Sequence, residues 1–247
     1  MYQNKKVVAT IEARMTSSRL PGKVLKKFCG IPDLQHIIER LRRSKYIDDI
    51  VVATTTNDTD NPVVELCNKI KCHYFRGSED DVLLRVLDAA KSVNADIIVE
   101  ITGDCPLVDW RHADYLIEQL FERKCDYVSN CMERTFSDGF DTQVFPVSVL
   151  DEVNRITQSA LDHEHVSLYI YRHPEKYKLW NWHAPEHLNH PELEVTLDTI
   201  EDYNCICKIF DALYPKEKDF TCEMVMQFLL EHPEVAEINK EIQRTQV

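Results

Sequence analysis

The chain lacks three features that would place it in particular classes of protein. No stretch approaches ~18 consecutive apolar residues, so a transmembrane helix is excluded. Basic residues are in deficit, 29 Lys and Arg against 42 Asp and Glu with a net charge of −13, which argues against a nucleic-acid groove. The N-terminal apolar run is short and ends at Glu12, unlike a signal peptide. We therefore expect a cytoplasmic protein that binds neither nucleic acid nor membrane.

Several sequence motifs with well-defined chemistry are also missing. The nine cysteines include no C-x-x-C pair, and in a long chain without a secretory signal they indicate reduced, mostly buried thiols. The phosphate-binding motif G-x-x-x-x-G-K-[ST] is absent, as is the zinc motif H-E-x-x-H. Neither a Walker loop nor a zincin-type metal centre is therefore predicted.

The first half alternates short β-branched runs with longer helical periods. Strands are predicted at 6–11, 50–54, 73–75, 96–101 and 127–129, and helices at 62–70, 80–92, 112–123 and from residue 32, where Leu34, Ile37, Ile38 and Leu41 share one face. Nearly continuous apolar strands separated by helices are typical of a parallel sheet covered on both faces. The fold class is therefore α/β, and ligands are expected at the carboxyl ends of the strands.

The second half is less regular. Strands are predicted at 141–145, 178–182 and 193–197, and helices at 147–157, 164–171, 200–213, 222–230 and 235–244. The composition shows no break, repeat or low-complexity linker between the halves. We therefore expect one domain over residues 1–247, with a nucleotide-binding part at about 1–130 and an acceptor or dimer part at about 131–247.

The segment after the first strand, ARMTSSRLPGK, concentrates positive charge at a strand's carboxyl end. Arg14, Arg19 and Lys23 lie within ten residues of one another, together with Ser17 and Ser18. Arginine gives forked donors to phosphate oxygens, lysine gives a mobile charge, and backbone amides of a Ser-rich turn can bind anions. An acidic protein that binds a triphosphate has to gather its cations locally, and this loop does so; a solvated basic loop is the alternative.

A series of blocks in this order resembles one known family. The blocks are EARMTSSRLPGKVLKKFCGIPDLQHIIERL, IDDIVVATTTN, FRGSEDDVLLR, ITGDCPLVD, SDGFDTQVF and LEVTLDTIEDY, and the match runs from about Val7 to Asn239. They resemble the CTP-dependent cytidylyltransferases, which include the Kdo and acylneuraminate synthetases, and most closely the SpsF-like branch associated with polysaccharide biosynthesis. Each block alone is weak evidence, whereas the ordered series is strong.

The resemblance implies a Rossmann-like nucleotidyltransferase fold, mainly a parallel sheet with helices on both faces. It implies transfer of CMP from CTP to an acceptor, with release of pyrophosphate, by a Mg²⁺-dependent enzyme that forms a homodimer. The acceptor would be an acidic sugar, a sugar derivative or a small phosphorylated molecule. By motif position, the catalytic residues would be Arg14, Lys23 and Asp104, the metal ligands Asp104 and Asp198, and the nucleotide-binding residues Ala13, Arg14, Ser17, Ser18, Arg19, Lys23, Arg76, Gly77, Ser78 and Thr102.

Elementary chemistry agrees with these assignments. Nucleotidyl transfer needs positioning and charge stabilisation more than a protein nucleophile, and magnesium binds through one or two carboxylates plus substrate phosphates. Asp104 and Asp198 each follow a predicted strand, so they could meet over the loop, although a turn or capping role is the alternative for each. Asp138 and Asp141 of SDGFDTQVF are candidate acceptor contacts, with solvated loop carboxylates as the alternative.

Five positions depart from the family pattern. Glu12, Thr16 and Glu100 stand where Gln, Gly and Arg are expected, and Trp110 and Ile200 replace prolines. Thr16 allows fewer backbone conformations than Gly, so the loop could have a different shape. Glu12 and Glu100 both add negative charge near the predicted pocket, which disfavours a strongly anionic acceptor. One hypothesis is an acceptor that carries an amine or another cationic group.

Other interpretations of the sequence remain open. His183, His187 and His190, and the segment DHEH at 162–165, could supply metal ligands, but Pro185 breaks the helix that would align the first two. Polar loop histidines are the simpler interpretation, and EHV at 164–166 resembles a family block, which favours a structural or pocket-wall role. Five aromatic residues between positions 169 and 182 could form a sugar platform, but packing is the simpler interpretation. They are Tyr169, Tyr171, Tyr177, Trp180 and Trp182. A non-catalytic nucleotide-binding protein and a nucleotidyltransferase for another base are the functional alternatives.

Overall fold

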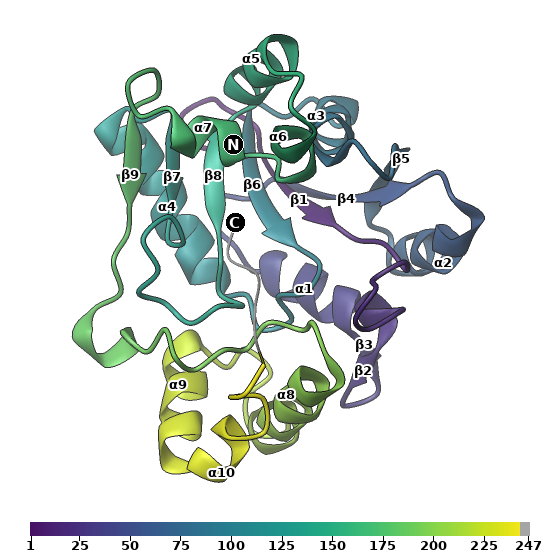
Figure 1. Cartoon of the computed structure of the whole chain (residues 1–247), viewed down its shortest axis with the longest axis vertical. Coiled ribbons are helices and arrows are strands. Elements are labelled where there is room, and N and C mark those ends of the chain that lie inside the picture. Colours follow the sequence, from purple (N-terminus) through teal and green to yellow (C-terminus); the bar gives the residue numbers. More distant parts are fainter. Residues whose placement is uncertain (243–247) are drawn as a thin grey trace.

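A computed structural model describes residues 1–242 of the chain (Figure 1). Within this range the main sheet has seven strands in the order β5-β4-β1-β6-β8-β7-β9. These strands are β1 (Val7–Glu12), β4 (Asp49–Thr55), β5 (His73–Gly77), β6 (Ile97–Thr102), β7 (Tyr127–Ser129), β8 (Gln143–Pro146) and β9 (Leu179–Asn181). Seven of the predicted strands lie within two residues of these bounds.

The centre of the sheet is parallel. β1 pairs in parallel with β4 and β6, and β4 pairs in parallel with β5. β8 runs antiparallel between β6 and β7, and β9 returns parallel to β7. The carboxyl ends of β1, β4, β5 and β6 therefore meet at one edge, where ligands are expected in an open α/β sheet.

Helices cover both faces of the sheet, as predicted for the α/β class (Figure 1). On one face lie α1 (Asp33–Leu41), α2 (Asn61–Ile70) and α4 (Trp110–Arg123), and on the other α3 (Val82–Ser92), α5 (Val147–Ile156) and α7 (Leu168–Arg172). The predicted apolar stripe of α1, from Leu34 to Leu41, is fully buried against the sheet. Val7, Ala9 and Ile11 of β1 face that side and Val8 faces the other, so the central strand is apolar on both sides.

Three C-terminal helices gather at one end of the molecule, shown below the sheet in Figure 1. They are α8 (Ile200–Leu213), α9 (Cys222–Glu231) and α10 (Pro233–Ala236), and they share an apolar cluster with Leu107 and Phe136. Buried Arg40 of α1 joins them to the sheet layer, because its guanidinium donates to the carbonyls of Val108 at 2.6 Å and Phe220 at 2.8 Å.

Three predicted elements differ from the structure. Residues 193–197 are not a strand, because Val195 and Leu197 donate to loop carbonyls instead of to a neighbouring strand. The stretch 164–171 is divided between α6 (Ala160–Glu164) and α7, with Val166 at a φ of 33° between them. The predicted helix 235–244 is limited to α10, and Arg244 lies outside the described residues.

Short elements complete the described chain. They are η1 (Lys23–Leu25), β2 (Lys27–Phe28), β3 (Ile31–Pro32), η2 (Asp58–Asp60) and η3 (Glu186–Leu188). Among residues 1–242, no helix combines the length and apolar character needed to cross a membrane.

Candidate active site

The loop after β1 folds back on itself before η1 begins. The amide of Gly22 donates to the carbonyl of Met15 at 2.9 Å, and the amide of Lys23 donates to that of Leu20 at 3.1 Å. Gly22 has a φ of 70°, a left-handed conformation that favours glycine. Val24, only 1% exposed, anchors the end of the loop in the core, so Lys23 leaves a fixed backbone position.

Two carboxylates beyond β4 and β5 hold this loop. Asp60, fully buried, accepts from the amides of Met15 at 2.7 Å and Thr55 at 3.2 Å. Glu79 accepts from Arg14 at 3.1 Å and from the hydroxyl of Thr16. Sequence reasoning missed both residues, although their positions beyond strand ends were a usable signal. Thr16, which stands where Gly was expected, therefore ties the loop to Glu79.

The turn after β6 touches the end of β1. The amide of Gly103 donates to the carbonyl of Glu12 at 2.9 Å. A Cβ atom at position 103 would lie only 2.4 Å from that carbonyl oxygen, so glycine is required by close backbone approach. This contact places Asp104 directly beside the loop of residues 13–23.

The segment 196–198 brings a second aspartate to the same point. The amide of Leu197 donates to the carbonyl of Asp104 at 2.8 Å, and the hydroxyl of Thr196 lies 3.3 Å from the same oxygen. Thr199 and Asp202 then form a capping box that starts α8. Asp198 is thereby fixed between Leu197 and Thr199. It lies close to Asp104, although the two residues are 94 positions apart in the sequence.

The ammonium of Lys23 lies between the two aspartates. Its Nζ atom is 2.8 Å from Asp104 Oδ2 and 2.8 Å from Asp198 Oδ1, and Arg19 lies 2.8 Å from the other oxygen of Asp198. Burial alone would lower the pKa of Lys23, but the two negative charges outweigh it and raise that pKa. Burial opposes ionisation of Asp104, yet Lys23 keeps the pKa of Asp104 below its ordinary value.

These residues border a cleft of about 370 Å³ at the carboxyl edge of the sheet. Nine predicted site residues line it: Ala13, Arg14, Ser17, Ser18, Arg19, Lys23, Thr102, Asp104 and Asp198. Arg85 of α3 and Glu164 and His165 of the α6–α7 junction also line it, which agrees with the second of the two roles, structural or pocket-wall, expected for Glu164 and His165. A larger cavity of about 550 Å³ lies at the opposite edge, near Lys5 and Cys125, but the charged groups described above converge on the smaller one.

The remaining predicted residues lie outside the lining of this cleft. Gly77 ends β5 and Ser78 follows it, while the guanidinium of Arg76 donates to the carbonyls of Thr55 at 2.8 Å and Asn57 at 2.7 Å. In the β7–β8 connection, Asp141 accepts two bonds from Arg134, at 2.8 and 2.9 Å, and Asp138 lies 3.8 Å from it.

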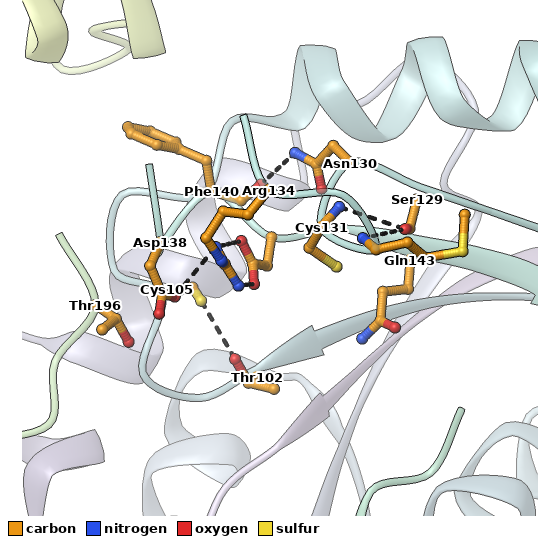
Figure 2. Close-up of polar contacts among 12 residues, drawn as sticks. Thr102, Cys105, Ser129, Asn130, Cys131, Arg134, Asp138, Phe140, Gln143 and Thr196 are labelled. Atoms are coloured by element: carbon orange, nitrogen blue, oxygen red, sulfur yellow. Dashed lines mark hydrogen bonds and ion pairs between the residues drawn. The ribbon is translucent and has the colours of Figure 1, made fainter. Parts of the chain in front are cut away.

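The β7–β8 connection nevertheless adjoins the cleft. Figure 2 shows Arg134 and Asp138 near Cys105 and Thr102, at the end of β6. Cys105 lies 3.2 Å from the hydroxyl of Thr102, which lines the cleft. Burial raises the pKa of Cys105, and the charges of Asp104, Asp141 and Asp138 add to that rise.

Glu12 and Glu100 form a buried carboxyl pair at the inner end of the cleft. They lie on adjacent strands and are hydrogen bonded to each other. Burial raises the pKa of Glu12 to about 7, with Arg85 opposing that rise. Burial, followed by the charge of Glu12, raises the pKa of Glu100 well above its ordinary range. The pair therefore holds a proton that two exposed glutamates would lose.

Two histidines of the alternative metal hypothesis, His183 and His190, pair with separate carboxylates. His183 lies 2.9 Å from Glu133, and His190 lies 3.0 Å from Glu192. Across residues 1–242, His, Cys, Asp and Glu side chains form no group of three or more that could hold a metal ion. Trp182 packs against Tyr115, Phe136 and His112, as expected for an aromatic residue in the core.

A mainly parallel sheet with a cationic loop after its central strand, and with two aspartates facing that loop, is the arrangement of a Rossmann-like nucleotidyltransferase. Residues 8–242 match the family model described as cytidylyltransferase. The chain belongs to the cytidylyltransferase family, which confirms the family predicted from the sequence.

Similar proteins support this membership along most of the chain. An uncharacterized protein of Methanocaldococcus jannaschii is 35% identical over 97% of this chain and 96% of its own. The spore coat polysaccharide biosynthesis protein SpsF of Bacillus subtilis is 34% identical over 93% and 96%, respectively. The structure of a cytidylyltransferase from Leptospira borgpetersenii is similar with a TM-score of 0.89 and 32% identity, covering 98% of this chain and all of that one.

Proposed function

We propose that the protein transfers CMP from CTP to an oxygen of a small acceptor, a sugar or sugar derivative, and releases pyrophosphate. The observation that carries this proposal is the convergence of Arg14, Arg19 and Lys23 with Asp104 and Asp198 on one cleft. Similarity to a spore coat polysaccharide protein supports a role in surface polysaccharide or glycoconjugate assembly.

In the proposed reaction the acceptor oxygen attacks the α-phosphorus of CTP in line. A new oxygen–phosphorus bond forms as the bond between the α-phosphorus and the α–β bridging oxygen breaks, and the proton of the acceptor hydroxyl passes to water. Arg14, Arg19 and Lys23 bind the triphosphate and stabilise the charge that develops on the leaving pyrophosphate. No covalent protein nucleophile is needed, because positioning and charge stabilisation lower the barrier.

The residues present fit a magnesium ion. Asp104 and Asp198 each direct an oxygen at one point, where the Lys23 ammonium lies in the free protein. Magnesium prefers such oxygen ligands and completes its shell with substrate phosphates and water. We propose that these two aspartates hold Mg²⁺, which would neutralise phosphate charge when bound. Direct contact of Arg76, Gly77 and Ser78 with the nucleotide stays a prediction, as do homodimerisation and a cytoplasmic location.

Nucleotide-dependent thermal stabilisation tests this proposal. CTP, UTP, ATP and GTP are compared, each with and without Mg²⁺, since a ligand that binds the native state raises its apparent stability. CTP with Mg²⁺ should give the largest shift. A larger shift with another nucleotide would show that the enzyme prefers a base other than cytosine. No shift with any of the four nucleotides at millimolar concentration would favour the non-catalytic alternative.

Two substitutions then test the assigned residues. Lys23→Ala and Asp104→Asn should each lower pyrophosphate release by at least about 100-fold, because each removes a charge facing the phosphates. Lys27→Ala, an exposed lysine four residues from Lys23, is the matched control and should keep its activity. Activity lost only in proportion to folding stability would contradict the assignment.

A further inference from the structure

One buried arginine that lines the cleft has an unpaired edge. Arg85 of α3 is only 3% exposed. Its Nη1 atom donates to the carbonyls of Ser78 and Glu79, whereas its buried Nε atom has no hydrogen-bond partner among residues 1–242. Within the same range Nη2 is not hydrogen bonded either, and no carboxylate forms a salt bridge with this guanidinium. Buried polar groups are nearly always paired in folded proteins, so this edge indicates a missing partner.

The shape of the unpaired edge restricts what that partner can be. A guanidinium is a planar fork whose five N–H donors have fixed directions. The N–H of Nε and one N–H of Nη2 point the same way, so together they match two acceptor atoms that lie side by side. A carboxylate, a phosphate and the O2–N3 edge of cytosine each offer such a pair of acceptors.

Arg85 packs against the segment FRGS, which the sequence predicts to contact the nucleotide. Gly77 makes room for the arginine side chain, since a Cβ atom there would lie 2.9 Å from Arg85 Cγ. The carbonyls of Ser78 and Glu79 then hold Nη1 in place. Arg76 of the same segment is engaged by carbonyls outside the lining of the cleft. Arg85 is therefore the arginine that this segment presents to the cleft.

Arg85 and the charged cluster around Lys23 lie on opposite sides of the sheet. The helix α3 covers one face, whereas Val24 and Cys105, which follow Lys23 and Asp104, pack on the other. Both groups nevertheless line the same cleft. A nucleotide whose triphosphate lies at Lys23 would therefore extend its base toward Arg85.

The charges around Arg85 favour a neutral partner over an anion. Burial lowers the pKa of Arg85 and Glu12 raises it, and the other charges that act on it are Arg14, Asp60 and Glu79. Because Glu12 keeps much of its proton near neutral pH, the two remaining carboxylates balance the two arginines. The missing partner thus has to supply acceptor atoms but no charge, which fits a pyrimidine base better than a carboxylate or a phosphate.

On the basis of the proposed function, we propose that Arg85 recognises the cytosine base by donating from Nε and Nη2 to its O2 and N3 atoms. Uracil carries a hydrogen on N3, so a donor of the base would face a donor of the arginine. A site that is built to hydrogen-bond a substrate atom rejects an analogue that lacks it, because the buried polar group is then left unpaired. Arg85 is in this way a specificity-determining residue that separates CTP from UTP.

Three nucleotides test this inference: CTP, UTP and 3-deaza-CTP, in which a C–H group replaces ring N3. The Kd of each with Mg²⁺ is measured by isothermal titration calorimetry. Wild type should bind CTP at least about tenfold more tightly than the other two, because each of them loses a hydrogen bond from a charged donor. Arg85→Met removes the donors and Arg85→Lys keeps the charge without the fork, so both variants should lose this preference. Arg155→Met, at an exposed arginine of α5, should keep it.

The outcomes separate this inference from the proposed function. Equal binding of CTP and 3-deaza-CTP by wild type overturns the inference alone, since an ordered water would then pair the fork. A preference for CTP that persists in both Arg85 variants overturns it too, because another group would then recognise the base. A preference that persists only in Arg85→Lys shows that the charge acts and not the fork, and it also contradicts the assignment. Absence of binding by all three nucleotides overturns the proposed function itself, and the inference with it.

Discussion

At the scale of single residues, the same chemical group has opposite properties at two points of the cleft. Asp104 is buried but faces Lys23, so its pKa is held low and it stays charged. Glu12 is also buried, and burial raises its pKa to about 7, although Arg85 and the hydrogen bond to Glu100 oppose the rise. Both carboxyl groups are buried, so the difference comes from the direct contact of Asp104 with Lys23. The end of the cleft proposed to bind phosphate and the end that retains a proton therefore lie close together.

The raised pKa of Glu12 predicts a pH-dependent stability. The folded state keeps a proton that the unfolded chain releases near its ordinary pKa of 4.5. This contribution is complete below that value and is lost as pH rises through about 7. Between pH 5 and pH 8, wild type should lose on the order of 2 kcal/mol relative to Glu12→Gln, measured by urea unfolding.

The control for this measurement is Glu234→Gln, whose carboxylate is exposed on α10. Its stability should follow that of wild type across the whole pH range. A constant difference between wild type and Glu12→Gln from pH 5 to pH 8 would show that Glu12 does not retain the proton.

Residue types could be predicted from the sequence where they cluster in it. Arg14, Arg19 and Lys23 share one loop, so the charge pattern was enough to predict that they would lie together, and all three line the same cleft. Asp60 and Glu79 were missed because they act on that loop from other strand ends, through contacts that only the fold creates. The departure at Glu100 from the expected Arg was visible, but its pairing with Glu12 depends on strand register.

At the scale of elements, the ends of β1 and β6 determine the shape of the site. Their pairing extends to Glu12 and Thr102, and just beyond it the amide of Gly103 donates to the carbonyl of Glu12. This close approach leaves no room for a side chain at position 103.

Gly103→Ala should therefore separate the two strand ends. The added Cβ would lie 2.4 Å from the Glu12 carbonyl, which is a backbone atom and cannot rotate away. We expect a loss of about 1–3 kcal/mol of unfolding free energy, as for overpacked sites, together with weaker CTP stabilisation, because the positions of Asp104 and Glu12 shift.

Gly30→Ala is the comparison for this variant. Gly30 has a φ of 80° and open space around it, so its substitution should cost about 1 kcal/mol of backbone strain. CTP stabilisation should stay unchanged in this variant. Equal effects of both substitutions on CTP stabilisation would contradict the conclusion that the β1–β6 contact determines the shape of the site.

The elements that sequence patterns predicted well are those that pair with neighbouring strands in a regular hydrogen-bonded ladder. β1, β4 and β6 were placed within a residue or two because their apolar runs are buried on both sides. The stretch LEVTL at 193–197 has strand-like alternation, yet its amides bond to the carbonyls of Asp138 and Asp104. Alternation of apolar and polar residues indicates that one side of a segment is buried, but it does not indicate which backbone groups the segment is hydrogen bonded to. That irregular pairing is also what places Asp198 in the site.

At the scale of the whole molecule, Arg40 joins the C-terminal helices to the sheet layer. Its buried guanidinium donates to carbonyls on both sides of the junction and lies over the ring of Phe220. Burial lowers the pKa of Arg40 to about 10, so it still carries a charge at neutral pH. Separation of the two layers would leave this charge and its carbonyl partners without their bonds.

The chain should therefore unfold in one cooperative transition, which would support the single-domain prediction. Far-ultraviolet circular dichroism and tryptophan fluorescence should give coincident urea curves. Arg40→Met should destabilise the protein by about 2–4 kcal/mol, because buried carbonyls lose a charged donor. Two separate transitions in wild type would instead indicate two domains.

Arg42→Met is the matched control. Arg42 also donates to two carbonyls, those of Ile70 and Lys71, but at the surface. Water replaces an exposed donor, so this substitution should cost less than about 1 kcal/mol. A similar cost for both arginines would contradict the linking role of Arg40.

Lys23 acts as a counter-ion that is covalently attached to the site it neutralises. A cation taken from solution loses its translational freedom, whereas this ammonium loses only side-chain rotamers. The free protein can thus keep two facing aspartates in place without any dissolved ion, and its folding should be indifferent to a chelator. Under the proposed function, phosphates would draw the ammonium toward themselves and so make the two carboxylates available to another cation. The pocket would then bind a cation that arrives with a nucleotide and would not bind one that arrives alone.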